Sequence, residues 1–351
     1  MMNANPSSAI DRLMCTLLGS IFAALLIISP TFASQDSDDL VEATIQAVVG
    51  LRSIVPDSAR TANSLGTERE GSGIVIGDDG LVLTIGYLIL EASDVEVTDI
   101  QGNYVPAEIV AYDYDSGFGL VRAIHSMGIR GIPLGESSLL SPDDAALIIS
   151  HIGPDYMQVV QIVDIREFPG YWEYLLDQAI FTTPPFSGFG GAALISTNGR
   201  LVGVGSLIVN DATTIDGSRP VPGNMFVPID LLKPIFNDLL LHGRAAGEQR
   251  PWLGVYTAVD RGHLFVFRVA FDSPAEKAGI KLNDIIVAVN GQPVSGMASF
   301  YKNVWATGPA GVDVRISVVR NGIVREIVVE SGDRYDWLRT NPTPQYSAML
   351  N

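Results

Sequence analysis

The sequence predicts a mostly β protein, in which a barrel pair or sandwich of strands precedes a smaller α+β domain. Short β-rich runs recur along most of the chain, with turn residues between them. Of the 351 residues, 35 are glycine and 20 are proline, as many tight turns would require. Hydrophobic residues make up 47% of the chain and charged residues 17%, so there is enough apolar material for two domain cores.

The strands of the first domain are expected after a helix and a loop. Residues 40–55 carry apolar side chains at near-helical spacing, and residues 56–70 are expected to form a loop. From Gly71 the pattern changes to short β-rich runs, and Asn198-Gly199 is one of the turn signals between them. The predicted strands are residues 74–76, 81–84, 95–98, 107–110, 120–123, 145–149, 159–165, 180–183, 193–195 and 201–209.

A helix is predicted where this domain ends. Apolar residues between Ile229 and His242 follow a helical period, and Gly243 can end the helix. After a polar linker, the order changes to strand, strand, short helix, strand, longer helix, strand, strand. The predicted divisions are a signal peptide at 1–33, a helix and linker at 34–65, a first domain at 66–243, a linker at 244–250, a second domain at 251–334 and a tail at 335–351.

The N-terminal segment is typical of an exported protein. Arg12 precedes an apolar run over residues 13–28, and Thr31-Phe32-Ala33 resembles a cleavage site. An uncleaved membrane anchor is the alternative. The only cysteine, Cys15, lies inside this segment, so a cleaved product would have no thiol for disulfides, catalysis or metal binding.

The net charge indicates which partners to exclude. There are 22 basic and 39 acidic residues, which gives a charge of −17 and argues against nucleic acid or an anionic membrane as the partner. No cofactor or metal site is predicted from the sequence.

The second domain contains several motifs at fixed spacing. Ser273 can cap a short helix that has Pro274 at its first position, and Gly279 can end it. Asn290-Gly291 is a hairpin signal, and the domain opens with residues 250–255, Arg-Pro-Trp-Leu-Gly-Val. Together these segments resemble a PDZ domain of the bacterial periplasmic protease type.

This resemblance implies peptide binding. A PDZ domain adds a ligand strand to a sheet edge and captures the ligand's terminal carboxylate with backbone N–H groups. The carboxylate loop of the family matches Trp252, Leu253, Gly254 and Val255, with a helix near residues 298–306 lining the groove. The alternative is that Trp252 and Leu253 are core residues where the domain begins.

The first domain also resembles a known family. Residues 71–76 and 80–84 match the opening strands of an HtrA/DegP-type serine protease, and residues 198–204 match its strand after the nucleophile loop. Residues 228–244 match its closing helix. The resemblance covers roughly residues 66–335 and implies a chymotrypsin-like double β-barrel in the bacterial periplasm.

The three catalytic positions of that family carry other residues here. Tyr87 stands in place of the histidine, Gly117 in place of the aspartate and Gly190 in place of the serine. A phenol with a pKa near 10 is a poor general base at neutral pH, and a glycine has no side chain with which to attack or orient. Ser187 is expected to be a turn hydroxyl, and the other candidates are expected to be structural: His125, His151, His242 and His263.

The resulting expectation is a pseudoprotease that binds peptides or proteins through its PDZ domain, in a chaperone-like or regulatory role in protein quality control. Its expected partners are C-terminal or unfolded polypeptide segments, or an active protease. The HtrA/DegP family forms trimers through N-terminal aromatic residues, and residues 34–70 contain none, so homo-oligomerisation is left open. The alternatives are an active endopeptidase with displaced catalytic residues and a PDZ scaffold.

Overall fold

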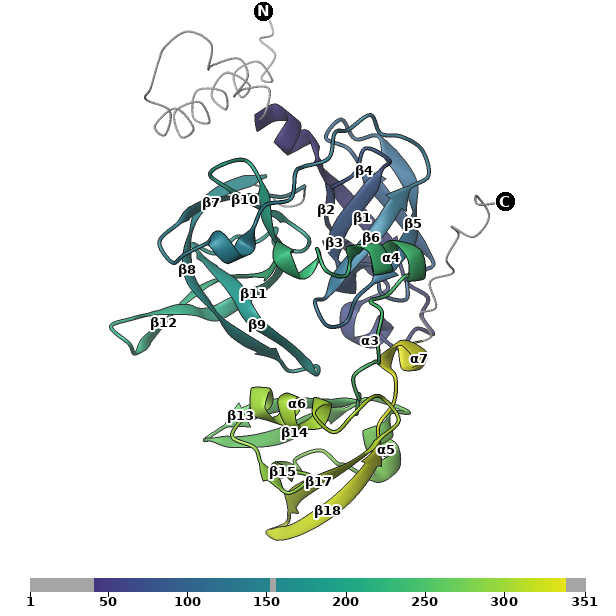
Figure 1. Ribbon diagram of the computed structural model, residues 1–351, viewed down its shortest axis with the longest axis vertical. Helices are drawn as coiled ribbons and strands as arrows, with labels where there is room; N and C mark the ends of the chain where they lie inside the picture. Colours follow the sequence, from purple (N-terminus) through teal and green to yellow (C-terminus); the bar gives the residue numbers. More distant parts are fainter. Residues whose placement is uncertain (1–40, 152–155, 339–351) are drawn as a thin grey trace, which may run out of the picture.

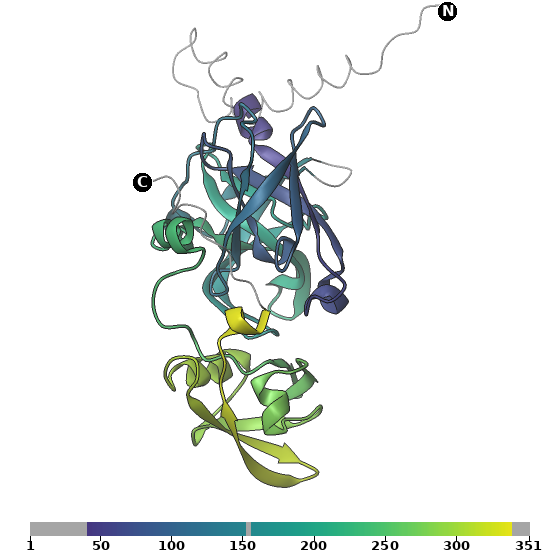
Figure 2. The same ribbon diagram turned by 90° about the vertical axis from the view of Figure 1, so that its right-hand side faces the viewer.

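The architecture consists of two closed β-barrels side by side and a separate sheet with helices at one end of the molecule (Figure 1). A computed structural model describes residues 41–151 and 156–338. The view turned by 90° shows that the molecule is elongated, with the last domain beyond the barrels (Figure 2). The signal peptide predicted at residues 1–33 lies outside the described residues. The mostly β fold class predicted from the sequence is confirmed.

Six strands close the first barrel in the order β1-β2-β3-β6-β5-β4. Its wall is apolar and buried on both faces, since the consecutive residues Val82 and Leu83 of β3 are both fully buried and point to opposite sides. A short helix, α3 (Ala62–Leu65), lies between β1 and β2, and a 3₁₀ turn, η1 (Gly86–Leu88), follows β3. The strands are β1 (Val48–Ile54), β2 (Glu68–Val75), β3 (Leu81–Ile85), β4 (Asp94–Thr98), β5 (Tyr104–Tyr112) and β6 (Phe118–Ala123).

The first strand corrects the predicted helix over residues 40–55. The helix covers only residues 41–46, and the chain then continues as β1. The spacing of apolar residues did not distinguish a helix from a strand here. In the structure, Leu51 pairs with Gly71 on one side and with Val97 on the other. These cross-strand hydrogen bonds close the barrel. The first domain therefore begins near residue 47, and its predicted boundary at 66 was wrong.

Six further strands close the second barrel in the order β10-β11-β12-β9-β8-β7. One of them, β12, was not predicted, because its prolines are typical of a loop. The hairpins β8–β9 and β11–β12 extend beyond the barrel (Figure 1). The strands are β7 (Ala145–Ile149), β8 (Met157–Gly170), β9 (Tyr174–Thr183), β10 (Ala193–Ser196), β11 (Leu201–Ile215) and β12 (Arg219–Pro228).

The helix predicted over residues 229–242 is divided. A 3₁₀ turn, η3 (Ile229–Leu231), precedes α4 (Phe236–His242). Pro234 lies between them, lacks an N–H group and disfavours helical geometry in the residue before it. The predicted end at Gly243 is confirmed, since this residue adopts a left-handed φ of 72°.

The last domain has the predicted order of elements. Ser273 caps α5 by accepting a hydrogen bond from the Glu276 N–H at 3.2 Å, with proline in the first turn. The sheet order is β13-β14-β15-β17-β18, and β16 pairs with β15. The elements are β13 (Val255–Asp260), β14 (His263–Val269), α5 (Pro274–Ala278), β15 (Ile285–Val289), β16 (Gln292–Pro293), α6 (Met297–Trp305), β17 (Asp313–Arg320) and β18 (Ile323–Glu330).

The start of the predicted tail is folded. A helix, α7 (Arg334–Leu338), buries Tyr335 and Leu338 against the first domain. The Tyr335 ring lies 4.3 Å from that of Tyr114, and its hydroxyl donates a hydrogen bond to the Tyr112 carbonyl at 2.9 Å. The tail boundary at 335 was therefore wrong, and residues 339–351 lie outside the described residues.

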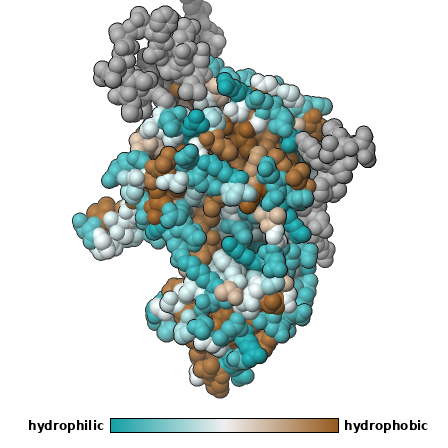
Figure 3. Space-filling model, in the orientation of Figure 1, coloured by the Kyte–Doolittle hydropathy of each residue, from teal (hydrophilic) through white to brown (hydrophobic). Residues whose placement is uncertain are grey.

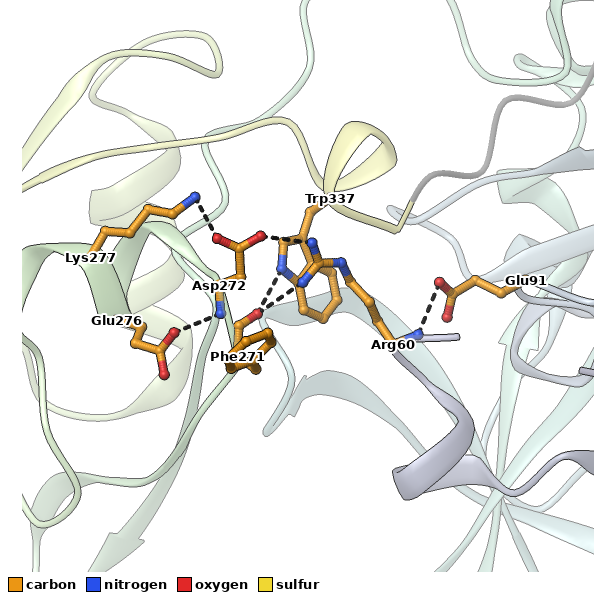
Figure 4. Close-up of polar contacts among 7 residues, drawn as sticks. All are labelled: Arg60, Glu91, Phe271, Asp272, Glu276, Lys277 and Trp337. Carbon is orange, nitrogen blue, oxygen red and sulfur yellow. Dashed lines mark hydrogen bonds and ion pairs between the residues drawn. The ribbon is translucent and has the colours of Figure 1, made fainter. Parts of the chain in front are cut away.

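A polar cluster joins the first domain to the last (Figure 4). Arg60 forms an ion pair with Asp272 at 2.8 Å and donates a hydrogen bond to the Phe271 carbonyl at 3.1 Å. The indole N–H of Trp337 donates to the same carbonyl at 3.1 Å, and the guanidinium lies 4.9 Å from the Trp337 ring. We call Arg60, Phe271, Asp272 and Trp337 the clamp. It lies along a cavity of about 1210 Å³ between the domains.

The surface is mixed in hydropathy (Figure 3). Hydrophobic residues gather at the far tip of the last domain, where Ile323 and Val324 of β18 are exposed. Within residues 41–151 and 156–338, no helix combines the length and apolar character needed to cross a membrane.

Candidate functional site

The three positions that resemble the catalytic triad come together between the barrels. Tyr87 lies in η1, Gly117 precedes β6, and Gly190 lies in the turn before β10. The N–H of Gly86 donates to the Gly117 carbonyl at 2.7 Å, so the first two positions are adjacent. A Cβ atom added to Gly190 would lie 3.0 Å from the Tyr87 hydroxyl, so the third position faces the first.

The Tyr87 side chain is held as a neutral phenol. Its hydroxyl donates a hydrogen bond to the Ser206 carbonyl at 3.0 Å. Burial raises the pKa of Tyr87 above its usual value because the phenolate would lose its hydration. A neutral phenol whose proton already has an acceptor cannot take a proton at neutral pH.

The space beside Gly117 is filled by another tyrosine. Gly117 has a left-handed φ of 83°, and a Cβ atom there would lie 3.1 Å from the Tyr174 hydroxyl. That hydroxyl donates to the Ser116 carbonyl at 2.5 Å. The nearby carboxylate, Asp115, instead pairs with Arg250 of the linker at 3.2 Å. The Asp113 carboxylate accepts hydrogen bonds from the Ser116 N–H and hydroxyl, so neither of these two carboxylates is paired with Tyr87 among the described residues.

The turn around Gly190 keeps a close-packed backbone. The Gly190 carbonyl accepts a hydrogen bond from the Ser72 N–H at 2.8 Å. Gly191 has a φ of 73°, and a Cβ atom there would lie 2.0 Å from the Ser72 carbonyl oxygen, so only glycine fits. Ser187, in the same turn, is exposed. The loop therefore keeps its shape without a side chain at position 190.

His151 is linked to this turn through Ser72, which bonds to the Gly190 carbonyl. Its backbone N–H donates to the Ser72 hydroxyl at 2.9 Å, and that hydroxyl also contacts the Ser150 hydroxyl at 3.0 Å. Burial lowers the pKa of the His151 imidazole. Ser72 is fully buried, so its hydroxyl cannot meet a substrate. Among the described residues, no cluster of His, Cys, Asp and Glu has an arrangement that could hold a metal ion.

The predicted carboxylate loop is preformed at the start of β13. The backbone N–H groups of Leu253, Gly254 and Val255 converge on one point. Gly254 has a φ of 86°, and a Cβ atom there would lie 2.3 Å from that of Ser273, so glycine is required. Trp252 differs from the other three, because its N–H donates to the Gly332 carbonyl at 3.0 Å. The side chain of Leu253 is also buried in the core of the last domain, as the alternative interpretation expected, and so is that of Val255, which that interpretation did not name.

The group that these N–H groups contact was missed from the sequence. It is the carboxylate of Glu173, in the turn between β8 and β9, with donor–acceptor distances of 2.9, 2.6 and 2.8 Å. Glu173 is only 7% exposed. No local signal indicates this contact, because the partners are about 80 residues apart in the chain.

Comparison with known proteins assigns both domains. Residues 71–204 match the trypsin-like peptidase domain family, and residues 251–330 match the PDZ domain family. The chain therefore has a segment that matches trypsin-like peptidase domains, followed by a segment that matches PDZ domains.

Two curated proteases are similar to this chain over most of its length. A probable periplasmic serine endoprotease, DegP-like, from Pseudomonas putida is 27% identical over 79% of this chain and 57% of its own length. The serine protease Do-like HtrA of Bacillus subtilis is 23% identical over 83% of this chain and 72% of its own length. The chain spans just over half the length of most of the DegP-like relatives it matches.

Solved structures agree on the fold. The HtrA-type protease AlgW with tripeptide is 21% identical, covers 84% of this chain and 96% of its own, and superposes with a TM-score of 0.50. This likeness shows that the two chains share a fold.

Proposed function

We propose that this protein is an exported HtrA-type pseudoprotease that binds polypeptide through its PDZ domain and does not cleave it. The main support is the group of residues at the triad positions, Tyr87, Gly117 and Gly190. They lie together between the barrels, and none of them can act as base, orienting carboxylate or nucleophile. Removal of any triad member in such enzymes leaves only residual catalysis.

The packing around these positions supports the loss of the whole catalytic triad. Tyr174 fills the space beside Gly117, and the Tyr87 hydroxyl is bonded to the Ser206 carbonyl. A Cβ atom at position 117 would crowd the Tyr174 hydroxyl and one at position 190 the Tyr87 hydroxyl, so restoring one side chain alone would not rebuild the triad. The binding function is supported by the loop at residues 253–255, whose N–H groups converge as a carboxylate requires.

The alternative of an endopeptidase with displaced residues requires a hydroxyl that substrate can reach and a base beside it. The Ser72 hydroxyl has histidine nearby but is buried. Ser187 is exposed, but no hydrogen bond between its hydroxyl and a base is found among the described residues. A PDZ scaffold would share the peptide loop and differ only in what the barrels do.

Export to the periplasm belongs to the same proposal. It is supported by the segment over residues 1–33 and by the names of the relatives, several of which are periplasmic. Fractionation of the host cell tests it, and recovery in the cytoplasm would contradict it.

Hydrolysis of labelled casein by the mature chain tests the loss of catalysis. We expect no turnover above a buffer blank, while trypsin in parallel cleaves the substrate. A fluorophosphonate probe, which labels activated serines, should leave the protein unmodified. Labelling that Ser72→Ala or Ser187→Ala abolishes would identify a displaced nucleophile and overturn the proposal.

A further inference from the structure

The turn between β8 and β9 occupies the peptide site of the PDZ domain. Glu173 provides the carboxylate that the loop at residues 253–255 binds, and all three donors lie within 2.9 Å of its oxygens. A terminal carboxylate presents the same two oxygens to a PDZ loop. The side chain of Glu173 therefore stands where a ligand's C-terminus would bind.

The backbone of the same turn pairs with the edge strand beside this loop. The N–H of Thr257, in β13, donates a hydrogen bond to the Tyr171 carbonyl at 3.1 Å. The hydroxyl of Tyr301, in α6, donates to the Gly170 carbonyl at 2.7 Å. The turn thus lies between β13 and α6, where a PDZ domain accepts an added strand.

Side chains of the turn and of the start of β9 complete the contact. Leu175 is 8% exposed and belongs to the hydrophobic core of the last domain, together with Leu253, Val255 and Tyr301. The Tyr171 ring packs at 5.7 Å from the Phe267 ring of β14. The hairpin carrying these residues points from the second barrel towards α6 in Figure 1. An apolar side chain and a carboxylate are the two features that a PDZ ligand offers.

The conformation of Glu173 is also unusual. It has a left-handed φ of 57°, which residues other than glycine, asparagine and aspartate rarely adopt. This backbone geometry aims the carboxylate at the three N–H groups, so the contact and the strained turn occur together.

We propose that residues 170–175 are a built-in ligand of the PDZ domain, and that a polypeptide with a free C-terminal carboxylate binds by displacing Glu173. This proposal rests on the peptide-binding part of the proposed function. An external C-terminus then competes with Glu173 for the same loop. Its apparent affinity equals the affinity for the free loop multiplied by the fraction of time that the turn leaves the loop free.

Amide hydrogen exchange on the full mature chain provides the first test. In the natural protein we expect the amides of Leu253, Gly254, Val255 and Thr257 to be protected. With Glu173→Ala, exchange at these amides should accelerate at least about ten-fold, because the site opens. Glu173→Gln keeps the size of the side chain, and should show a smaller acceleration. Asp164→Ala is the matched control, since it removes a carboxylate of the same hairpin that pairs with Arg166 of its own strand, and it should leave these amides unchanged.

Peptide binding provides the second test. The probe is a mixture of fluorescein-labelled decapeptides with randomised last four positions, made with a free carboxylate or with a C-terminal amide. Glu173→Ala should bind the carboxylate form at least about ten-fold more tightly than the natural chain, with no gain for the amide form. Unchanged amide protection in Glu173→Ala, or an affinity equal to that of the natural chain, would overturn the built-in ligand. Casein hydrolysis would contradict the proposed function and leave this proposal standing.

Discussion

The contacts of the clamp are expected to control how often the peptide loop at residues 253–255 is exposed to solvent. Arg60→Ala removes the hydrogen bond to the Phe271 carbonyl and the contact with the Trp337 ring. The Arg60 side chain is 17% exposed, so a charged hydrogen bond and a cation–π contact together contribute about 2 kcal/mol. The ion pair with Asp272 is screened by solvent and is given no share of this figure.

The expected result follows from that free energy. A loss of about 2 kcal/mol from the closed arrangement raises the open fraction roughly 30-fold. If the peptide loop is exposed only when the domains separate, the amides of Leu253, Gly254 and Val255 should exchange faster by about this factor. Amides within the sheet of the last domain should keep their rates, which would exclude general unfolding.

Lys277→Ala is the matched control for this experiment. Lys277 contacts the same carboxylate of Asp272 at 2.9 Å, but it lies in α5 of the last domain, so this ion pair is within one domain. Its replacement should leave exchange at the loop unchanged. Equal exchange in Arg60→Ala and the natural protein would refute the reasoning, because it would mean that the clamp does not control access to the loop.

Further predictions concern stability, measured by urea unfolding. Arg320→Ala should destabilise the PDZ domain by about 3–5 kcal/mol, because it leaves the buried Asp284 carboxylate without the two hydrogen bonds, at 2.6 and 2.7 Å, that Arg320 donates. Burial opposes ionisation of Asp284, but the hydrogen bonds from Arg320 and the Lys281 N–H outweigh this effect and lower the pKa of Asp284. The ionised Asp284 therefore contributes fully to stability above about pH 4, and this contribution is lost as the pH falls through the pKa of the folded state. Asp284→Asn should flatten the dependence of stability on pH, and an unchanged pH profile would contradict this prediction. Gly191→Ala should cost at least about 1–3 kcal/mol from strain and a clash, whereas Gly217→Ala, at a φ of 68° with open space around it, should cost less; equal losses would show that the close packing of the turn has no effect.

Local patterns predicted much of the fold because they depend on neighbours in the chain. The cap at Ser273, the helix end at Gly243 and the turn at Asn290-Gly291 each follow from one or two residues. The strands predicted between Gly71 and Val209 also lie within observed strands, except that β2 ends at Val75, one residue before the predicted end at Ile76. The wrong assignment of β1 has a different origin, since Leu51 is fixed by partners about 20 and 46 residues away.

The candidate sites divide in the same way. Gly254 could be identified as part of a peptide loop, because only glycine permits the close approach that such a loop needs. Tyr174 could not be assigned to the space beside Gly117, because that contact depends on how the two barrels pack. The role of Glu173 was hidden for the same reason.

The sequence by itself determined the two-domain organisation, the turn chemistry and the side chains at the triad positions, because each of these is a property of residue type at a given spacing. Only the tertiary structure decided which groups fill the space around those positions and which carboxylate the loop at residues 253–255 holds. These contacts join residues far apart in the chain, and their energies depend on distance in space, which no local pattern contains.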